Sequence, residues 1–163
     1  MNQHETLGVD RDLLLDFFLT FARAEFALKN SIFWKDYQDS AEPDWDKFSN
    51  AIKNKFKEKK DITDELKAAF DYIFLNPPRK QCIENGHLTW EERLPDENLW
   101  EAQIIVILIR RIRNNLFHGG KHFNDNIKDT ERDNLLLKNA LLIIHECISL
   151  HPNVKTQYDQ ARI

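Results

Sequence analysis

The sequence predicts an all-α protein that carries one short β-hairpin. Only four glycines and five prolines occur in 163 residues, and 31% of the residues are charged. Apolar residues recur at helical spacing over most of the chain, which is typical of a helical protein rather than a β-sandwich or barrel. The exception is Asn85-Gly86, which separates two short runs and favours the positive φ values of a type I′ turn. We therefore expect a small β-hairpin insertion near residues 80–90.

The first three helices can be placed from apolar stripes and from the residues that begin and end helices. The first is expected over residues 9–35, where apolar residues recur every three or four positions. Asp44 is a good N-cap for the second helix, because its carboxylate can accept a hydrogen bond from a free backbone N–H. The third begins near Thr63 and must end before Pro77 and Pro78.

The fourth helix is the most apolar segment of the chain. It begins near residues 96–97 and is apolar nearly all round from Leu99 to Ile112, which predicts a central, buried element. Gly119-Gly120 follows and is typical of a helix end. A fifth helix is expected over residues 130–150, with Pro152 marking its end.

The length fits a single domain over residues 1–163, since single domains most often hold on the order of 100 to 150 residues. Residues 1–9 are polar, and we expect both these residues and a C-terminal tail, 152–163, to be mobile. The two cysteines are too few for a disulfide framework, and no segment resembles a signal peptide or a membrane span. These features predict a cytoplasmic protein with no membrane partner.

Positive charge is local in this sequence. The formal net charge is -4, which argues against a protein that coats nucleic acid through its overall field. Cations gather in two places, one near the end of the fourth helix (Arg110, Arg111, Arg113, Lys121 and His122) and one in the second helix (Lys53, Lys55, Lys57, Lys59 and Lys60). The lysine run is explained by the outer face of an amphipathic helix, and a role in attracting RNA is the alternative.

The end of the fourth helix combines arginine, asparagine and histidine. Arg110, Asn114 and His118 follow one another at spacings of four, and Arg113 lies about 100° away around the helix. Arginine offers a planar, permanently charged donor fork for phosphate oxygens, and histidine exchanges a proton near neutral pH. This combination fits the chemistry of a phosphodiester.

The segment Arg113–His118 resembles the arginine-asparagine-x-x-x-histidine signature of the HEPN superfamily. Many members are metal-independent endoribonucleases of toxin, antiviral and RNA-processing systems. Residues Ala24–Lys29 are similar to the first-helix pattern of these domains, which often places an acidic residue there, and the Asn-Gly hairpin resembles a branch from mobile elements and defence islands. The similarity covers roughly residues 13–150. It implies an all-α, HEPN-like four- to five-helix up-and-down bundle.

The resemblance also implies a site and a reaction. Arg113, Asn114 and His118 take the family's catalytic positions, and two protomers commonly share the site. His118 or its symmetry mate would remove the proton of an RNA 2′-hydroxyl, and Arg113 would stabilise the charge that grows on the phosphate. The expected partners are RNA, a second copy of the chain, and an antitoxin or regulatory protein. No cofactor and no metal ion are expected.

Several residues around this motif carry two interpretations. We expect Arg110 and Lys121 to bind RNA or phosphate, and Glu25 to orient Arg113. Alternatively, Glu25 and Arg113 form a purely structural ion pair, and His118 only caps its helix. The four tryptophans can stack on bases or pack in the core, and the cysteines and histidines lack the spacing of metal ligands. The alternative function is a non-catalytic HEPN module that binds RNA, nucleotide or a protein partner.

Overall fold

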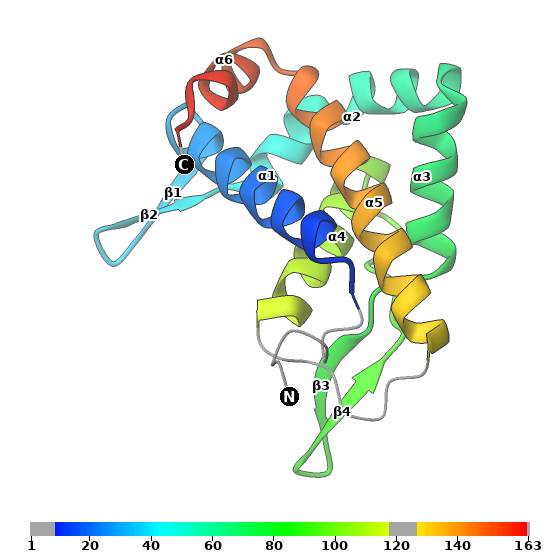
Figure 1. Ribbon diagram of the computed structural model, residues 1–163. Helices are drawn as coiled ribbons and strands as arrows, with labels where there is room; N and C mark the ends of the chain where they lie inside the picture. Colours follow the sequence, from blue (N-terminus) through cyan, green and yellow to red (C-terminus); the bar gives the residue numbers. More distant parts are fainter. Residues whose placement is uncertain (1–8, 118–126, 163) are drawn as a thin grey trace.

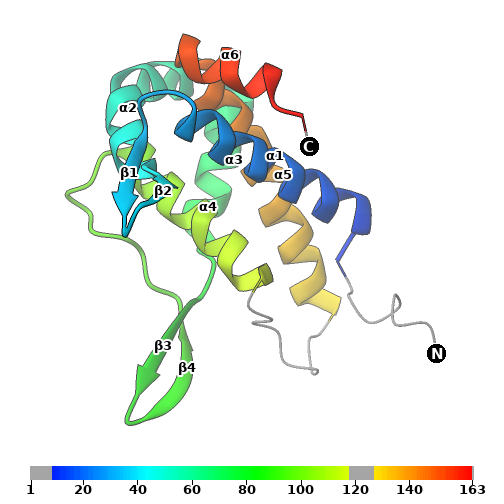
Figure 2. The ribbon, with the colours of Figure 1, turned by 90° about the vertical axis from the view of Figure 1, so that its left-hand side faces the viewer.

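The computed structural model describes residues 9–117 and 127–162. This part of the chain is mostly helical, as predicted, and contains six helices and two β-hairpins. The helices pack into one body, and both hairpins project from it (Figures 1 and 2). The elements are, in chain order, α1 (Arg11–Lys29), β1 (Trp34–Tyr37), β2 (Ser40–Pro43), α2 (Trp45–Ile62), α3 (Asp64–Leu75), β3 (Lys80–Glu84), β4 (His87–Glu91), α4 (Glu101–Phe117), α5 (Ile127–Ser149) and α6 (Pro152–Gln160).

Aspartate caps define where α1 and α2 begin. The Asp10 carboxylate accepts a hydrogen bond from the backbone N–H of Leu13 at 3.0 Å. The Asp44 carboxylate accepts one from the backbone N–H of Lys47 at 2.9 Å, which confirms the predicted start of the second helix. The helix expected over residues 9–35 ends earlier, at Lys29.

The residues that follow α1 form a hairpin that the sequence did not predict. Gln38 and Asp39 adopt φ values of 51° and 62° and make the turn between β1 and β2. Phe33 is buried, and its carbonyl accepts a hydrogen bond from the backbone N–H of Asp44 at 2.8 Å, which closes the base of the hairpin. The turn contains no glycine, so it lacks the usual sequence signal of a two-residue hairpin loop.

The second hairpin confirms the prediction for residues 80–90. Asn85 and Gly86 form its turn with φ values of 51° and 77°, and Glu84 pairs with His87 beside the turn. At the base, Lys80 pairs with Glu91. Figure 2 shows this hairpin extending well away from the helices.

Helix α4 is a main contributor to the core, as expected. It packs against α2, and α5 packs against both α1 and α3. The buried residues of α4 are Ala102, Ile104, Ile105, Val106, Leu108, Ile109 and Ile112. The helix begins later than predicted because the Asp96 carboxylate accepts a hydrogen bond from the backbone N–H of Asn98 at 2.9 Å and so forms a separate turn. Among the described helices, none has the length and the apolar character that crossing a bilayer requires.

The expected mobile tail, 152–163, is instead largely helix α6, which packs against α1 and α5. Val154 and Tyr158 are buried in the core. Arg23 of α1 places its guanidinium 4.2 Å from the centre of the Tyr158 ring and donates a hydrogen bond to the Tyr158 carbonyl at 2.9 Å. Pro152 ends α5 but also starts α6, because proline is favourable in the first turn of a helix. Most of the polar N-terminal segment, residues 1–8, lies outside the described residues.

Candidate functional site

The candidate site lies where the last turns of α4 meet α1. Arg110, Arg113 and Asn114 project from α4, and Glu25 projects from α1. His118 follows the last residue of α4 in the sequence, but His118 and Lys121 both lie outside the described residues. The structure therefore brings together four of the six predicted site residues, and the positions of the other two stay predictions.

Arg113 is held on several sides. Its Nη2 lies 3.3 Å from Oε1 and 3.5 Å from Oε2 of Glu25, and its Nη1 donates a hydrogen bond to Oδ1 of Asn114 at 2.8 Å. The guanidinium carbon also lies 5.2 Å from the ring centre of Phe21 and 5.5 Å from that of Phe117. These contacts fix the direction of the guanidinium before any ligand binds.

Glu25 is in turn held by a core residue. Nε1 of Trp45 donates a hydrogen bond to Oε1 of Glu25 at 3.3 Å, and the Trp45 ring packs 5.2 Å from the ring of Phe21. Trp45 is almost completely buried, so it does not move freely. This arrangement is consistent with an orienting role for Glu25, and it equally describes a structural ion pair. No sequence pattern indicates that Trp45 belongs to the site, because its position fits the apolar stripe of the second helix.

A cavity of about 250 Å³ opens beside Arg113. Its lining combines α1, α2 and α4 with the β1–β2 hairpin: Phe21, Glu25, Lys35, Glu42, Pro43, Trp45, Arg110, Arg113 and Asn114. The side chain of Arg113 is 31% exposed, so part of the guanidinium is available to a ligand. Three cations and an amide therefore surround a space that accommodates a phosphate group, next to two carboxylates.

Lys35 and Glu42 reach this cavity because the unpredicted hairpin places them there. They face each other as cross-strand partners in β1 and β2. Neither residue is predicted from the sequence, because the apolar spacing extends the expected first helix through Lys35 and the segment before Asp44 is polar. The two strands have only four residues each, and the turn between them has no glycine, so the sequence does not show that they form a hairpin.

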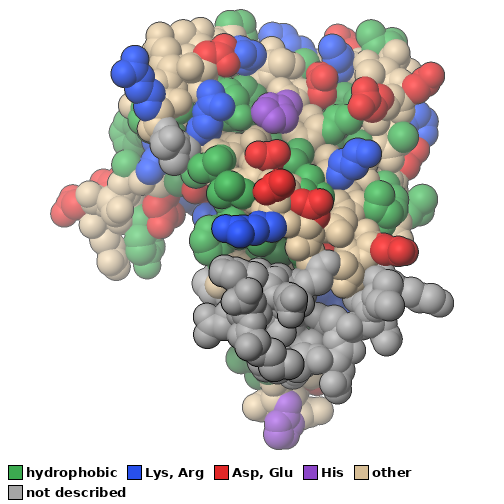
Figure 3. All heavy atoms as spheres, in the orientation of Figure 1, with side chains coloured by type: hydrophobic (Ala, Val, Ile, Leu, Met, Phe, Trp, Pro, Cys, Tyr) green, Lys and Arg blue, Asp and Glu red, His purple; other side chains and the backbone are tan. Residues whose placement is uncertain are grey.

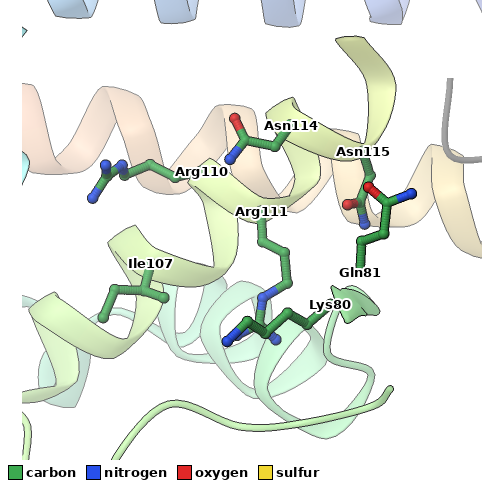
Figure 4. Close-up of a pocket in the computed structure, with 7 residues that line it drawn as sticks. All are labelled: Lys80, Gln81, Ile107, Arg110, Arg111, Asn114 and Asn115. Atoms are coloured by element: carbon green, nitrogen blue, oxygen red, sulfur yellow. The ribbon is translucent and has the colours of Figure 1, made fainter. Parts of the chain in front are cut away.

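A second cavity, of about 410 Å³, lies between α4 and the base of the β3–β4 hairpin (Figure 4). It is lined by Lys80, Gln81, Ile107, Arg110, Arg111, Asn114 and Asn115. Arg110 and Asn114 line both cavities, so the two spaces adjoin along α4. In contrast to the first cavity, no carboxylate is among the lining residues of the second.

Arg111 keeps its charge in the second cavity although it is half-buried. Burial lowers the pKa of Arg111, Cys82 acts in the opposite direction, and Arg93 lowers the pKa further. The ordinary pKa of arginine is so far above neutral pH that Arg111 remains a guanidinium cation. Within residues 9–117 and 127–162, no three histidine, cysteine or acidic side chains come together in a way that could hold a metal ion.

Sequence similarity adds nothing to this geometry. Comparisons of the chain with protein-family models, with curated proteins and with solved structures found no match.

Proposed function

We propose that this protein is a metal-independent endoribonuclease of the HEPN type, which acts on RNA as a cytoplasmic homodimer in a toxin or defence system. The observation that carries the proposal is the preorganised guanidinium of Arg113. It is held by Glu25 and Asn114 and opens onto a cavity with the size and charge for a phosphate group. His118 lies five residues further along the sequence, directly after the end of α4.

In the proposed reaction, the 2′-oxygen of a ribose attacks the adjacent phosphorus while the bond to the 5′-oxygen breaks. The imidazole of His118 accepts the 2′-hydroxyl proton, and the 5′-oxygen leaves with a proton from a second acid, such as His118 of the second copy. Arg113 binds the non-bridging oxygens as their charge grows. Since Oδ1 of Asn114 accepts the hydrogen bond from Arg113, its NH₂ group is left to donate to the phosphate. The products are a 2′,3′-cyclic phosphate and a 5′-hydroxyl.

The homodimer is supported by a second apolar stripe on α1. Leu15, Leu19, Ala22 and Phe26 follow one another at spacings of four, three and four and are all exposed, at 53%, 39% and 41% for Leu15, Leu19 and Phe26. On the face where α1 and α5 lie in front, exposed apolar side chains occur among charged ones (Figure 3). Glu25 lies on the same helix, so a second copy bound at this stripe would lie beside the site.

The cleavage test uses RNA, EDTA and end-group analysis. We expect the wild-type protein to cut single-stranded RNA in EDTA and to leave 2′,3′-cyclic phosphates. Arg113→Ala should lower the rate by about 10²- to 10³-fold, the usual loss for a donor that stabilises an oxyanion. Arg162→Ala is the matched control, because Arg162 is exposed and lies far from α4 in the sequence. Cleavage that depends on divalent metal, or a parallel loss of folding and cleavage in Arg113→Ala, would contradict the proposal.

One observation favours the alternative of a non-catalytic module. Arg113 already has an ion pair with Glu25 and a hydrogen bond to Asn114, which a purely structural or ligand-binding arginine would also make. Binding of RNA, nucleotide or a protein partner without any cleavage product would identify this alternative.

A further inference from the structure

We propose that the second cavity, beside the base of the β3–β4 hairpin, binds the phosphodiester next to the scissile one in a single RNA strand, with Lys80 as its principal contact. This inference rests on the proposed function, because it names how the same site holds its substrate. It assigns the hairpin base a role in substrate binding.

The lining of this cavity has the composition of an anion site. Three cations, Lys80, Arg110 and Arg111, surround it with three amide side chains, and no carboxylate is among the lining residues. Lys80 is exposed, and its ammonium makes neither a hydrogen bond nor an ion pair with the described residues. Its charge is therefore available for a phosphate oxygen. Figure 4 shows Lys80 from β3 and Arg111 from α4 extending toward the same side of the cavity.

The hairpin base is fastened to α4, which holds Lys80 in place. Nη1 of Arg111 donates hydrogen bonds to the carbonyls of Pro78, at 3.2 Å, and of Arg93. Nδ2 of Asn115 donates to the carbonyl of Arg79 at 2.8 Å. These bonds secure the chain on both sides of the hairpin and directly before Lys80, so the lysine is presented from a rigid support rather than from a free loop.

The two cavities adjoin, which favours a polynucleotide over a single phosphate. Arg110 and Asn114 line both, so a strand whose scissile phosphate sits at Arg113 can pass over Asn114 to Lys80. A nucleic-acid backbone carries one negative charge per nucleotide, and successive cationic sites along a groove are how proteins follow a single strand. Because the whole protein carries a net charge of -4, its overall field does not attract RNA, and the attraction must come from a local strip of cations.

The test measures RNA binding in a His118→Ala background, where cleavage is removed. A short labelled single-stranded RNA is titrated by fluorescence anisotropy over a series of NaCl concentrations. Lys80→Gln should reduce the slope of log K against log salt by about 0.7 and weaken binding about fivefold near 0.1 M salt, as expected for one lost phosphate contact. Lys80→Arg should keep both values. Lys155→Gln is the matched control, because Lys155 lies on α6, which Figure 1 shows at the opposite end of the molecule from β3, and pairs with Asp159.

The outcomes separate this inference from the proposed function. If Arg113→Ala weakens binding but Lys80→Gln behaves like Lys155→Gln, the inference is overturned and the nuclease proposal stands. If Lys80→Gln weakens the binding of a mononucleotide as much as the binding of the oligonucleotide, the cavity is a single-anion site. The assignment to a flanking phosphodiester is then wrong. If the His118→Ala protein binds no RNA, both proposals fail. Unchanged thermal melting of Lys80→Gln ensures that a loss of binding is not a loss of fold.

Discussion

At the scale of single residues, the site depends on how firmly Arg113 is held. The guanidinium has an ion pair, a hydrogen bond and two aromatic neighbours, while 31% of the side chain remains exposed. Glu25 accepts a hydrogen bond from Nη2 of the guanidinium, and Trp45 donates a hydrogen bond to the same Glu25 carboxylate. In the proposed reaction, Glu25 would therefore act as a positioning residue, which reaches the phosphate only through Arg113.

Substitution of Glu25 should change the chemical step more than the binding of RNA. We expect Glu25→Ala to lower kcat by about 10- to 100-fold, because a misdirected guanidinium no longer meets the oxyanion, and to leave KM nearly unchanged. Glu25→Gln keeps an oxygen that can accept from Trp45 and Arg113, so it should recover part of the rate. The measurement is a KM and kcat comparison of the three proteins. Equal rates in all three would show that the ion pair is only structural.

The sequence predicted the members of the site on α4 and α1 but not their neighbours. Two short motifs contain Arg113, Asn114 and Glu25, and Arg110 is predicted because it lies four residues before Asn114 on the same helical stripe. Lys35, Glu42 and Lys80 could not be identified in this way, since what brings each of them to a cavity is a contact between segments far apart in the chain. Nothing in the local pattern distinguishes these residues from other exposed, charged side chains.

At the scale of the elements, those with a strong local sequence signal were predicted, whereas two short elements without such a signal were not. Asp44, Asn85-Gly86 and the apolar run of α4 gave clear signals that the structure confirms. The β1–β2 hairpin and α6 were missed, because four-residue strands and a nine-residue helix are stabilised by packing more than by local preference. Lys60 also departs from the expected outer face of α2, since it is buried and its Nζ lies 3.3 Å from Oε1 of Glu101.

The contribution of α6 can be measured at Tyr158. Tyr158→Ala should lower the free energy of unfolding by about 3 to 5 kcal/mol, because it empties a buried aromatic position and removes the contact with Arg23. Tyr158→Phe should change it by less than about 1 kcal/mol, since the buried hydroxyl has no hydrogen-bond partner among the described residues. Chemical denaturation of the three proteins provides the values. Wild-type stability in Tyr158→Ala would show that α6 does not belong to the core.

At the scale of the whole molecule, the unusual feature is a helix with two apolar faces. One face of α1 is buried in the core through residues such as Phe17, Phe21 and Ala24. The opposite face carries the exposed stripe that contains Leu15, Leu19 and Phe26. Solvent contact with such a stripe is unfavourable, and a partner helix of the same kind would bury both copies.

The stripe predicts a dimer that one charge should disrupt. Light scattering of the wild-type protein should give a mass near twice 19.4 kDa, and Leu19→Glu should shift it toward 19.4 kDa, because the carboxylate would face its own symmetry mate in an apolar interface. Ile62→Glu is the matched control, since Ile62 is 83% exposed at the end of α2 and does not belong to the stripe. If the site is shared, Leu19→Glu loses RNA cleavage along with the dimer while its melting temperature stays near that of the wild type. If the wild-type protein is a monomer and still cleaves RNA, cleavage does not need a dimer, and the apolar stripe of α1 is not a dimer interface.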